Sequence, residues 1–261
     1  MLARTTLAWI GFAAMAVAAP ETITGQTVPT NVMVRVTAHD AKIIGTDVGG
    51  ARVTLRDAET GQVLAEGIQQ GSTGNTRLIM VQPRKRGARV YDTGNAAGFL
   101  ATIDLGEPIL VEIIAEGPLG TPHATQRASK TMLLVPGKDV LGEGVVIDLL
   151  GFTVVVEEPS DGASVEAGKE FEIRANVTML CGCPTEPGGM WDANEIEIVA
   201  MIKRGDRVLT TVPLAFAGQR NTYTTMATVD EPGPIEIQVL AMDPGRANFG
   251  QAIRLVAVVR E

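Results

Sequence analysis

Short runs in which apolar and polar residues alternate, each bounded by turn residues, recur along most of this chain of 261 residues. Residues 31–40 (NVMVRVTAHD) alternate with a period of two, and residues 50–67 contain two such runs joined by the turn DAETG. This period places every second side chain on one face of a strand, whereas a helix needs a period of about 3.6. Aromatic residues make up only 4% of the chain, and no long amphipathic helical pattern is found. The sequence therefore predicts an all-β protein built from β-sandwiches.

The first residues show the three-part pattern of a secretory signal peptide. MLART carries one arginine, the apolar run LAWIGFAAMAV follows, and AVAAP offers small residues at the cleavage positions. We expect cleavage after Ala18 or Ala19, which removes residues 1–19 and makes the protein periplasmic or secreted. The apolar run is shorter than the about 20 residues of a membrane-spanning helix, although an uncleaved anchor is the alternative. No later run has that length, so we expect no membrane span after cleavage.

The chain divides near residue 150, where one apolar run ends and the segment GFTVVVEEPSDG begins another. We expect two domains after the signal peptide, at residues 20–150 and 151–261. Residues 20–151 contain 12 basic and 14 acidic residues, whereas residues 152–261 contain 9 and 16. The formal net charge of −8 argues against a nucleic-acid-binding protein, which normally has a basic face. The basic cluster PRKRGAR at residues 83–89 is an exception, and it is interpreted as a solvated loop or as a docking site for an acidic partner.

Each half resembles a known type of β-sandwich. The segment GARVTLRDAETGQVLAEGIQQGSTGNTRL resembles the transthyretin-like or carboxypeptidase-regulatory-like domain of secreted bacterial proteins over about residues 30–110, although its last turn, GSTGNT, lacks the usual aspartate. VEEPSDGASVEAGKEFEIRANVT is similar to the opening of bacterial immunoglobulin-like domains, and Asp243, Asn248 and Gly250 match their last hairpin. The first resemblance implies a non-catalytic support role, and the second implies a fold but little about function.

Both cysteines lie in the segment CGCPTEPGGMWD at residues 181–192, which we call the cysteine loop. The immunoglobulin-like pattern predicts strands at residues 152–158, 169–180, 195–204, 222–229, 234–242 and 251–259. The cysteine loop then follows the second strand, and the hairpin DPGRANFGQ lies at the same end of the sandwich. Because the first strand also starts at that end, we expect the cysteine loop to lie at the joint between the domains. Asp243 and Asn248 would then face the loop residues Trp191 and Asp192.

The cysteine loop is open to several interpretations. A disulfide between Cys181 and Cys183 is favoured by an oxidising export compartment, although so short a ring removes little entropy from the unfolded chain. Two thiolates with the thioethers of Met179 and Met190 would instead suit a soft metal ion, Cu(I). The pair could also exchange disulfides with another protein, although acidic neighbours such as Asp192 would raise the thiol pKa values. Finally, the loop could be a structural plug or a docking site for a protein.

Motifs of catalysis are not found in the sequence. The chain has no phosphate-binding loop, no dinucleotide fingerprint, no HExxH and no nucleophile elbow. Its two histidines, His39 and His123, lie far from the cysteine loop in sequence. We therefore predict a non-enzymatic extracytoplasmic binding protein with a Cu(I) site formed by the two cysteines and two methionines just named. The alternatives are a structural, assembly or docking module with a protein partner in the cell envelope, and a thiol–disulfide exchange protein.

Overall fold

The computed structural model describes residues 26–260, so the predicted signal peptide at residues 1–19 lies outside the described residues. Strands dominate the described part of the chain and form four sheets, which confirms the predicted all-β fold. The helices are single turns: η1 (Thr46–Val48), η2 (Arg77–Val81), η3 (Pro122–Ala124), η4 (Ala193–Glu195) and η5 (Pro244–Arg246). Within residues 26–260, none of the helices combines the length and the apolar character that crossing a membrane requires.

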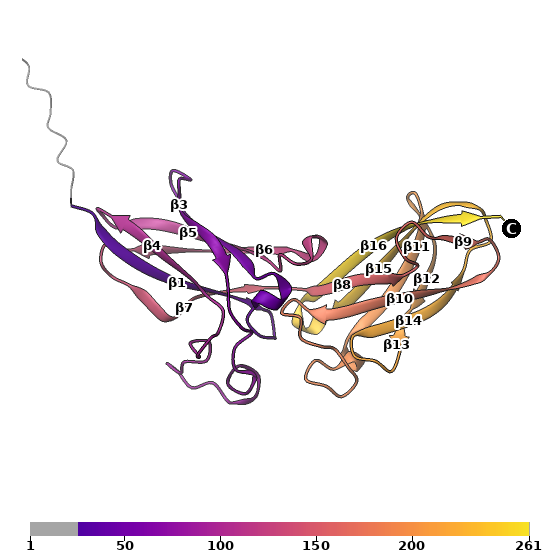
Figure 1. Ribbon diagram of the computed structural model, residues 1–261, viewed down its shortest axis with the longest axis horizontal. Coiled ribbons are helices and arrows are strands. Elements are labelled where there is room, and N and C mark those ends of the chain that lie inside the picture. The colour runs from indigo at the N-terminus through magenta and orange to yellow at the C-terminus, as the bar shows by residue number, and fades with distance from the viewer. Residues whose placement is uncertain (1–25, 261) are drawn as a thin grey trace, which may run out of the picture.

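The strands before residue 150 form two sheets that pack face to face (Figure 1). They are β1 (Val28–Ala38), β2 (Ala51–Asp57), β3 (Val63–Gln69), β4 (Phe99–Leu105), β5 (Ile109–Gly117), β6 (Gln126–Leu134) and β7 (Val140–Leu149). One sheet has the order β4-β1-β7 and the other β3-β2-β5-β6. Val34 and Val36 of β1 meet Leu55 and Ile113 of the opposite sheet in one buried cluster, as the alternating pattern requires. We call these two sheets the N-terminal body.

The strands after residue 151 form the C-terminal body, again with two sheets (Figure 1). They are β8 (Phe152–Glu158), β9 (Ser164–Glu166), β10 (Glu170–Met179), β11 (Glu197–Arg204), β12 (Arg207–Pro213), β13 (Ala215–Phe216), β14 (Thr222–Thr228), β15 (Gly233–Asp243) and β16 (Asn248–Val259). The orders β13-β14-β10-β8 and β12-β11-β15-β16-β9 divide the strands as an immunoglobulin-like sandwich does. The six predicted strands are confirmed to within three residues at each end, whereas β9, β12 and β13 were not predicted.

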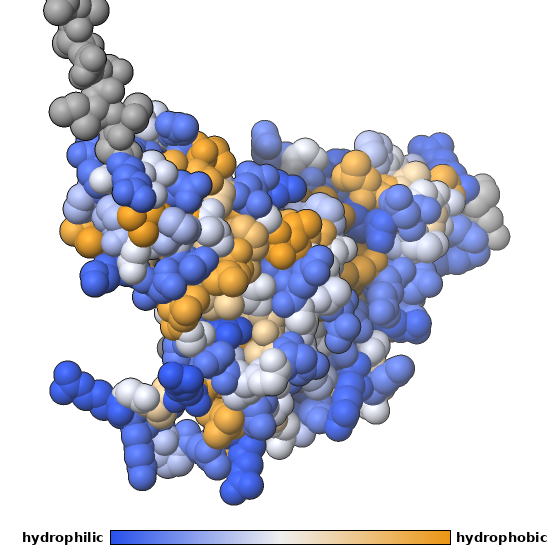
Figure 2. Space-filling model, turned by 60° about the vertical axis from the view of Figure 1, so that its left-hand side comes forward, coloured by the Kyte–Doolittle hydropathy of each residue, from blue (hydrophilic) through white to orange (hydrophobic). Residues whose placement is uncertain are grey.

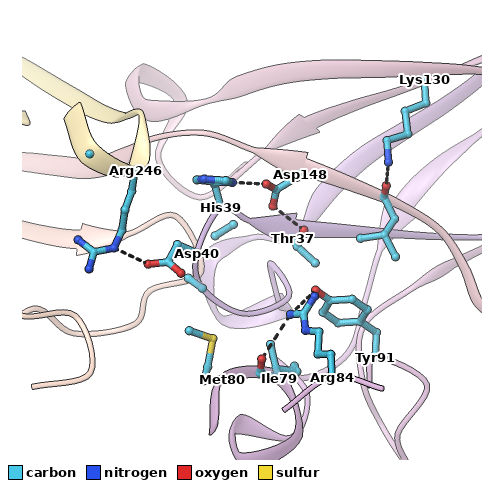
Figure 3. Close-up of a pocket in the computed structure, with 14 residues that line it drawn as sticks. Thr37, His39, Asp40, Ile79, Met80, Arg84, Tyr91, Lys130, Asp148 and Arg246 are labelled. Atoms are coloured by element: carbon cyan, nitrogen blue, oxygen red, sulfur yellow. Dashed lines mark hydrogen bonds and ion pairs between the residues drawn. The ribbon is translucent and has the colours of Figure 1, made fainter. Parts of the chain in front are cut away.

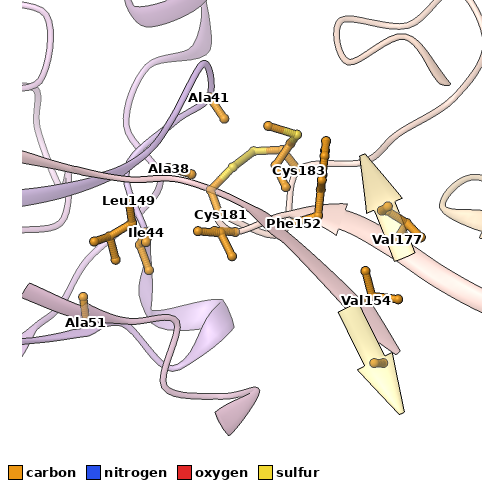
Figure 4. Packing of buried hydrophobic residues seen from close by; sticks show 14 of the residues in the cluster. Ala38, Ala41, Ile44, Ala51, Leu149, Phe152, Val154, Val177, Cys181 and Cys183 are labelled. Carbon is orange, nitrogen blue, oxygen red and sulfur yellow. A yellow bond between two sulfur atoms is a disulfide. The ribbon is translucent and has the colours of Figure 1, made fainter. Parts of the chain in front are cut away.

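Only Leu150 and Gly151 separate the last strand of the N-terminal body from the first strand of the C-terminal body. The buried cluster is continuous across this joint, because Leu149 and Phe152 belong to the same cluster as the cores on either side (Figure 4). The backbone of Gly151 has φ = 136°, and a Cβ there would lie 2.9 Å from the carbonyl oxygen of Phe249. A glycine is therefore needed for the chain to pass this close to β16.

Candidate functional site

The cysteine loop leaves the end of β10 through a tight turn. The amide of Gly182 donates to the carbonyl of Met179 at 2.8 Å, and the amide of Met179 donates to the carbonyl of Cys183 at 3.0 Å. Gly182 has φ = 75°, a conformation that glycine adopts without a steric cost. This turn places the Cα atoms of Cys181 and Cys183 5.4 Å apart, and the two sulfur atoms form a disulfide.

The disulfide lies where the two bodies meet, and we call this region of contact the seam. Cys181 and Cys183 are only 3% and 4% exposed, and they belong to the cluster that contains Ala38 and Phe152 (Figure 4). A Cβ added at Gly182 would lie 2.8 Å from Cγ1 of Val48, in the N-terminal body. Side chains on both sides therefore shield the two sulfur atoms from water, whereas Gly182 itself is exposed.

Beyond the disulfide, the loop is fixed to the start of β14 by a buried set of hydrogen bonds around Thr185. Its hydroxyl donates to the carbonyl of Val177 at 2.7 Å and accepts from the hydroxyl of Tyr223 at 2.7 Å. The amide of Thr185 donates to Oδ1 of Asn221 at 3.0 Å. Burial raises the pKa of the Tyr223 hydroxyl above its usual value, so this group remains a neutral donor.

Trp191 and Asp192 end the cysteine loop and have structural partners. The indole Nε1 of Trp191 donates to the carbonyl of Asp40 in the N-terminal body at 2.9 Å. Oδ1 of Asp192 accepts from the amides of Gly188 and Asn194, each at 2.9 Å, and thereby caps helix η4. The hydrogen bonds from these amides, with that of Asn194 the stronger, hold the pKa of Asp192 below its usual value.

The loop between β15 and β16 completes the seam through Arg246. Its guanidinium forms ion pairs with Asp40 of the N-terminal body (Nε to Oδ2, 2.9 Å), with Glu195 (Nη2 to Oε2, 2.6 Å) and with Asp243 (Nη1 to Oδ2, 2.9 Å). Hydrogen bonds to Asp243, and then to Glu195, raise the pKa of Arg246, which is therefore always charged. Of these four residues, only Asp243 was singled out by the sequence.

Asn248 is fully buried and connects both bodies to the linker. Its Oδ1 accepts from the amide of Gly151 at 2.7 Å, and its Nδ2 donates to the carbonyl of His39 at 3.4 Å. The structure thus places Asn248, Asp243, Trp191 and the disulfide around one seam. Each of these side chains has a structural partner there.

In the structure the two cysteines predicted as metal ligands are bonded to each other. The disulfide occupies both sulfur atoms, Met179 is buried, and Met190 is 50% exposed. The two methionines line one small pocket with Trp191, but within residues 26–260 no three His, Cys, Asp or Glu side chains are grouped to hold a metal ion. In the bonded state these residues do not fit Cu(I), which binds thiolates.

The two histidines have partners of their own. His39 pairs through Nδ1 with Oδ2 of Asp148, and His123 donates from Nε2 to the carbonyl of Val154 at 2.7 Å. His123 therefore ties helix η3 of the N-terminal body to β8 of the C-terminal body. Neither contact involves the cysteine loop.

No family model matches this chain. No curated protein matches it either. Among solved structures, it is similar to an engineered protein, with 18% identity and a TM-score of 0.32. This match covers 48% of this chain and 24% of the engineered protein. It is also similar to the fibronectin(III)-like modules of CbhA from Clostridium thermocellum, at 11% identity and a TM-score of 0.30, over 89% of this chain and 95% of that one.

A third similar structure is the D1–D4 ectodomain fragment of ICAM-5, with 13% identity and a TM-score of 0.29. The match covers 81% of this chain and 46% of the ICAM-5 fragment. At these TM-scores the fold assignment rests on the strand order of the chain itself. That order makes the C-terminal body an immunoglobulin-like sandwich, a fold that serves many functions.

Proposed function

We propose that this protein is a non-enzymatic structural or binding module that works in the periplasm or outside the cell. The cysteine loop, together with Arg246 and Asn248, holds its two β-sandwiches in one fixed relative orientation. The observation that carries this proposal is the set of contacts in the seam. Trp191 and Arg246 bind Asp40 of the N-terminal body, and Asn248 binds the linker at Gly151. The disulfide fixes the turn between them. In this proposal the N-terminal body is a transthyretin-like support domain, and the rigid pair presents its surface to a protein partner in the envelope.

Two features favour a location outside the cytoplasm. The pattern of residues 1–19 is that of a cleaved export signal. The Cys181–Cys183 bond would also persist in an oxidising compartment, whereas cytosolic thiols are kept reduced. Mass spectrometry of the protein recovered from cell fractions, with the N-terminus sequenced, tests both points.

The rigidity of the seam can be measured in solution from residual dipolar couplings of the chain that lacks residues 1–19. A rigid seam predicts that one alignment tensor fits the couplings of both bodies. The double variant Arg246→Gln with Asn248→Ala should require two tensors, because it removes the ion pair to Asp40 and the contact with Gly151. If the unmodified protein already requires two tensors, the two bodies move independently and the proposal is wrong.

A matched control makes the same two substitutions away from the seam, at Arg204 and Asn176. Arg204 pairs with Glu231 at 2.8 Å, and Asn176 lies on β10 of the same body. This control variant should keep a single tensor. A control that also loses it would show that general destabilisation of the C-terminal body, and not the seam, decides the orientation.

The Cu(I) prediction can be retained only for a reduced form of the protein, because copper needs the thiolates. Anaerobic titration of the reduced chain against a Cu(I) chelator tests it, with Cys181→Ser/Cys183→Ser as the control. Binding of one copper that requires both cysteines would add metal binding to the structural role. Thiol–disulfide exchange has a further obstacle, since an attacking thiolate must reach a sulfur atom and both cysteines are buried.

A further inference from the structure

A cleft of about 610 Å³ opens beside the seam, on the side of the N-terminal body. It lies where the end of β1, the long β3–β4 segment, strands β6 and β7 and the β15–β16 loop come together (Figure 3). Its volume falls within the range of about 300–1,000 Å³ that is typical of ligand pockets. Arg84 and Lys130, which also line it, take no part in the contacts of the seam and have no role in the function proposed above.

The two carboxylates of the cleft already have partners. Asp40 is paired with Arg246, and Asp148 is paired with His39 while also accepting from the hydroxyl of Thr37 at 2.8 Å (Figure 3). These contacts hold both acidic groups on one part of the wall, where Arg246 is shared with Glu195 and Asp243 and so does not cancel the negative charge.

The two remaining cations of the cleft pair only with neutral groups in the described part of the chain. Nζ of Lys130 donates to the carbonyl of Val146 at 2.6 Å. Nη2 of Arg84 donates to the hydroxyl of Tyr91 at 3.0 Å and to the carbonyl of Ile79 at 3.3 Å. Both side chains keep further N–H donors, and among residues 26–260 no carboxylate pairs with either cation.

The position of Arg84 is preorganised. Its guanidinium carbon lies 5.3 Å from the centre of the Tyr91 ring, in a cation–π contact. The amide of Tyr91 in turn donates to both carboxylate oxygens of Glu143, at 3.1 and 3.0 Å. A charged donor that is already held in place loses less entropy when it binds an anion.

The chemistry of the walls narrows the class of anion. Apolar side chains lie beside the cations, among them Ile79, Met80 and Val146. Asp40 and Asp148 would repel a second negative charge, which disfavours a phosphate with its charge of about −1.5 to −2. The β3–β4 segment also carries the exposed basic cluster at residues 83–89, and of this cluster Arg84 lines the cleft. This segment hangs below the N-terminal sheets in Figure 1, and hydrophilic side chains project from that lower part in Figure 2.

We propose that this cleft binds a monocarboxylate with an apolar body, whose carboxylate pairs with Arg84 while the charge of Lys130 adds to the positive potential of the cleft. Such a group is supplied either by a free organic acid or by the C-terminus of a peptide that ends in an apolar residue. The inference goes beyond the structural role proposed above and does not depend on the rigidity of the seam.

The test is an NMR titration of the chain lacking residues 1–19 with four probes. They are the peptide N-acetyl-Ala-Phe with a free carboxylate, its C-terminal amide, 3-phenylpropionate and phenyl phosphate. We expect the peptide acid or 3-phenylpropionate to bind, and to shift the amides of Tyr91 and Lys130. The amide peptide should bind at least about tenfold more weakly, since a hydrogen bond between charged groups is lost. Comparable affinity of the two acids indicates a free organic acid as the ligand, whereas a tenfold preference for the peptide indicates a C-terminus.

The variant Arg84→Gln/Lys130→Gln should weaken binding of the acid about tenfold or more. The matched control Lys85→Gln/Arg86→Gln removes the same charge from residues that do not line the cleft, and it should bind nearly as the unmodified protein does. The proposal is overturned if no probe binds, if acid and amide bind equally, if phenyl phosphate binds more tightly, or if the control loses as much affinity. If the Arg84 variant fails to fold, two measurements on the unmodified protein still test the proposal. They are the comparison of the acid with the amide peptide and the set of amides whose NMR signals shift.

Discussion

Asn248 gives the sharpest test of how the seam is held together. Its side chain is 0% exposed and accepts from the amide of Gly151 at 2.7 Å, so Asn248→Ala leaves a buried N–H group without a partner. An unsatisfied buried donor costs about 1–3 kcal/mol. The bond from Nδ2 to the carbonyl of His39, at 3.4 Å, is too long to add much. We therefore expect the free energy of unfolding to fall by about 2 kcal/mol.

Urea unfolding of the chain lacking residues 1–19 provides the assay. Trp191 is then the only tryptophan, so its fluorescence reports the seam directly, while circular dichroism reports the strands of both bodies. Asn248→Ala should lower the urea midpoint in both signals with little change in slope. The matched control Asn176→Ala changes a half-buried residue of β10. It should stay within about 0.5 kcal/mol of the unmodified protein.

Equal urea midpoints for Asn248→Ala and the unmodified protein would contradict the reasoning, because the Gly151 amide would then have to find another partner at no cost. A fluorescence transition that precedes the circular dichroism transition would have a different meaning. It would show that the seam opens while both sandwiches are still folded.

Three further predictions concern the cysteine loop. Cys181→Ser/Cys183→Ser should remain folded and lose less than about 2 kcal/mol in urea unfolding, because the bond closes a very short loop; a chain that cannot fold would contradict this. Tyr223→Phe removes the donor to Thr185 and should lower stability by about 1 kcal/mol in the same assay, and an unchanged midpoint would refute the contact. The pKa of Asp192 is held below its usual value of 3.8, so its contribution is full above that pH and is lost as the pH falls through the lowered folded-state pKa. Asp192→Asn should therefore make stability less dependent on pH below about pH 4, which thermal melts across that range would show.

The strands were the most predictable part of the fold. Residues 152–158 match β8 at both ends, because a strand with one buried face must alternate and the turns at its ends are marked by glycine and proline. The missed strands are those with little alternation. β9 and β13 have only three and two residues, and β12 is an edge strand whose side chains are mostly half-buried or exposed. Such strands are set by the neighbour with which they pair rather than by their own pattern.

The candidate site shows a similar division. The sequence singled out the cysteines and Trp191 because these rare residues lie together in one turn segment, and Asn248 because it matches the last hairpin of immunoglobulin-like domains. It gave no sign of the ion pairs between Arg246, Asp40 and Glu195, nor of the cations that line the cleft. An arginine in a turn and an aspartate 206 positions earlier look like solvated charges until the chain is folded.

The sequence by itself determined an all-β chain with an immunoglobulin-like second half and a Cys-Gly-Cys turn that ends its second strand. The all-β prediction follows from local chemistry: the period of the strands and the small number of turn types. The immunoglobulin-like second half, and the place of the Cys-Gly-Cys turn in it, were implied by the resemblance to bacterial immunoglobulin-like domains. Only the tertiary structure decided that the two cysteines are bonded and buried, that Asn248 satisfies the linker amide, and that Arg84 and Lys130 line the same cleft. Burial and charge pairing depend on which distant segments meet, and that is a property of the packed chain rather than of any one stretch of it.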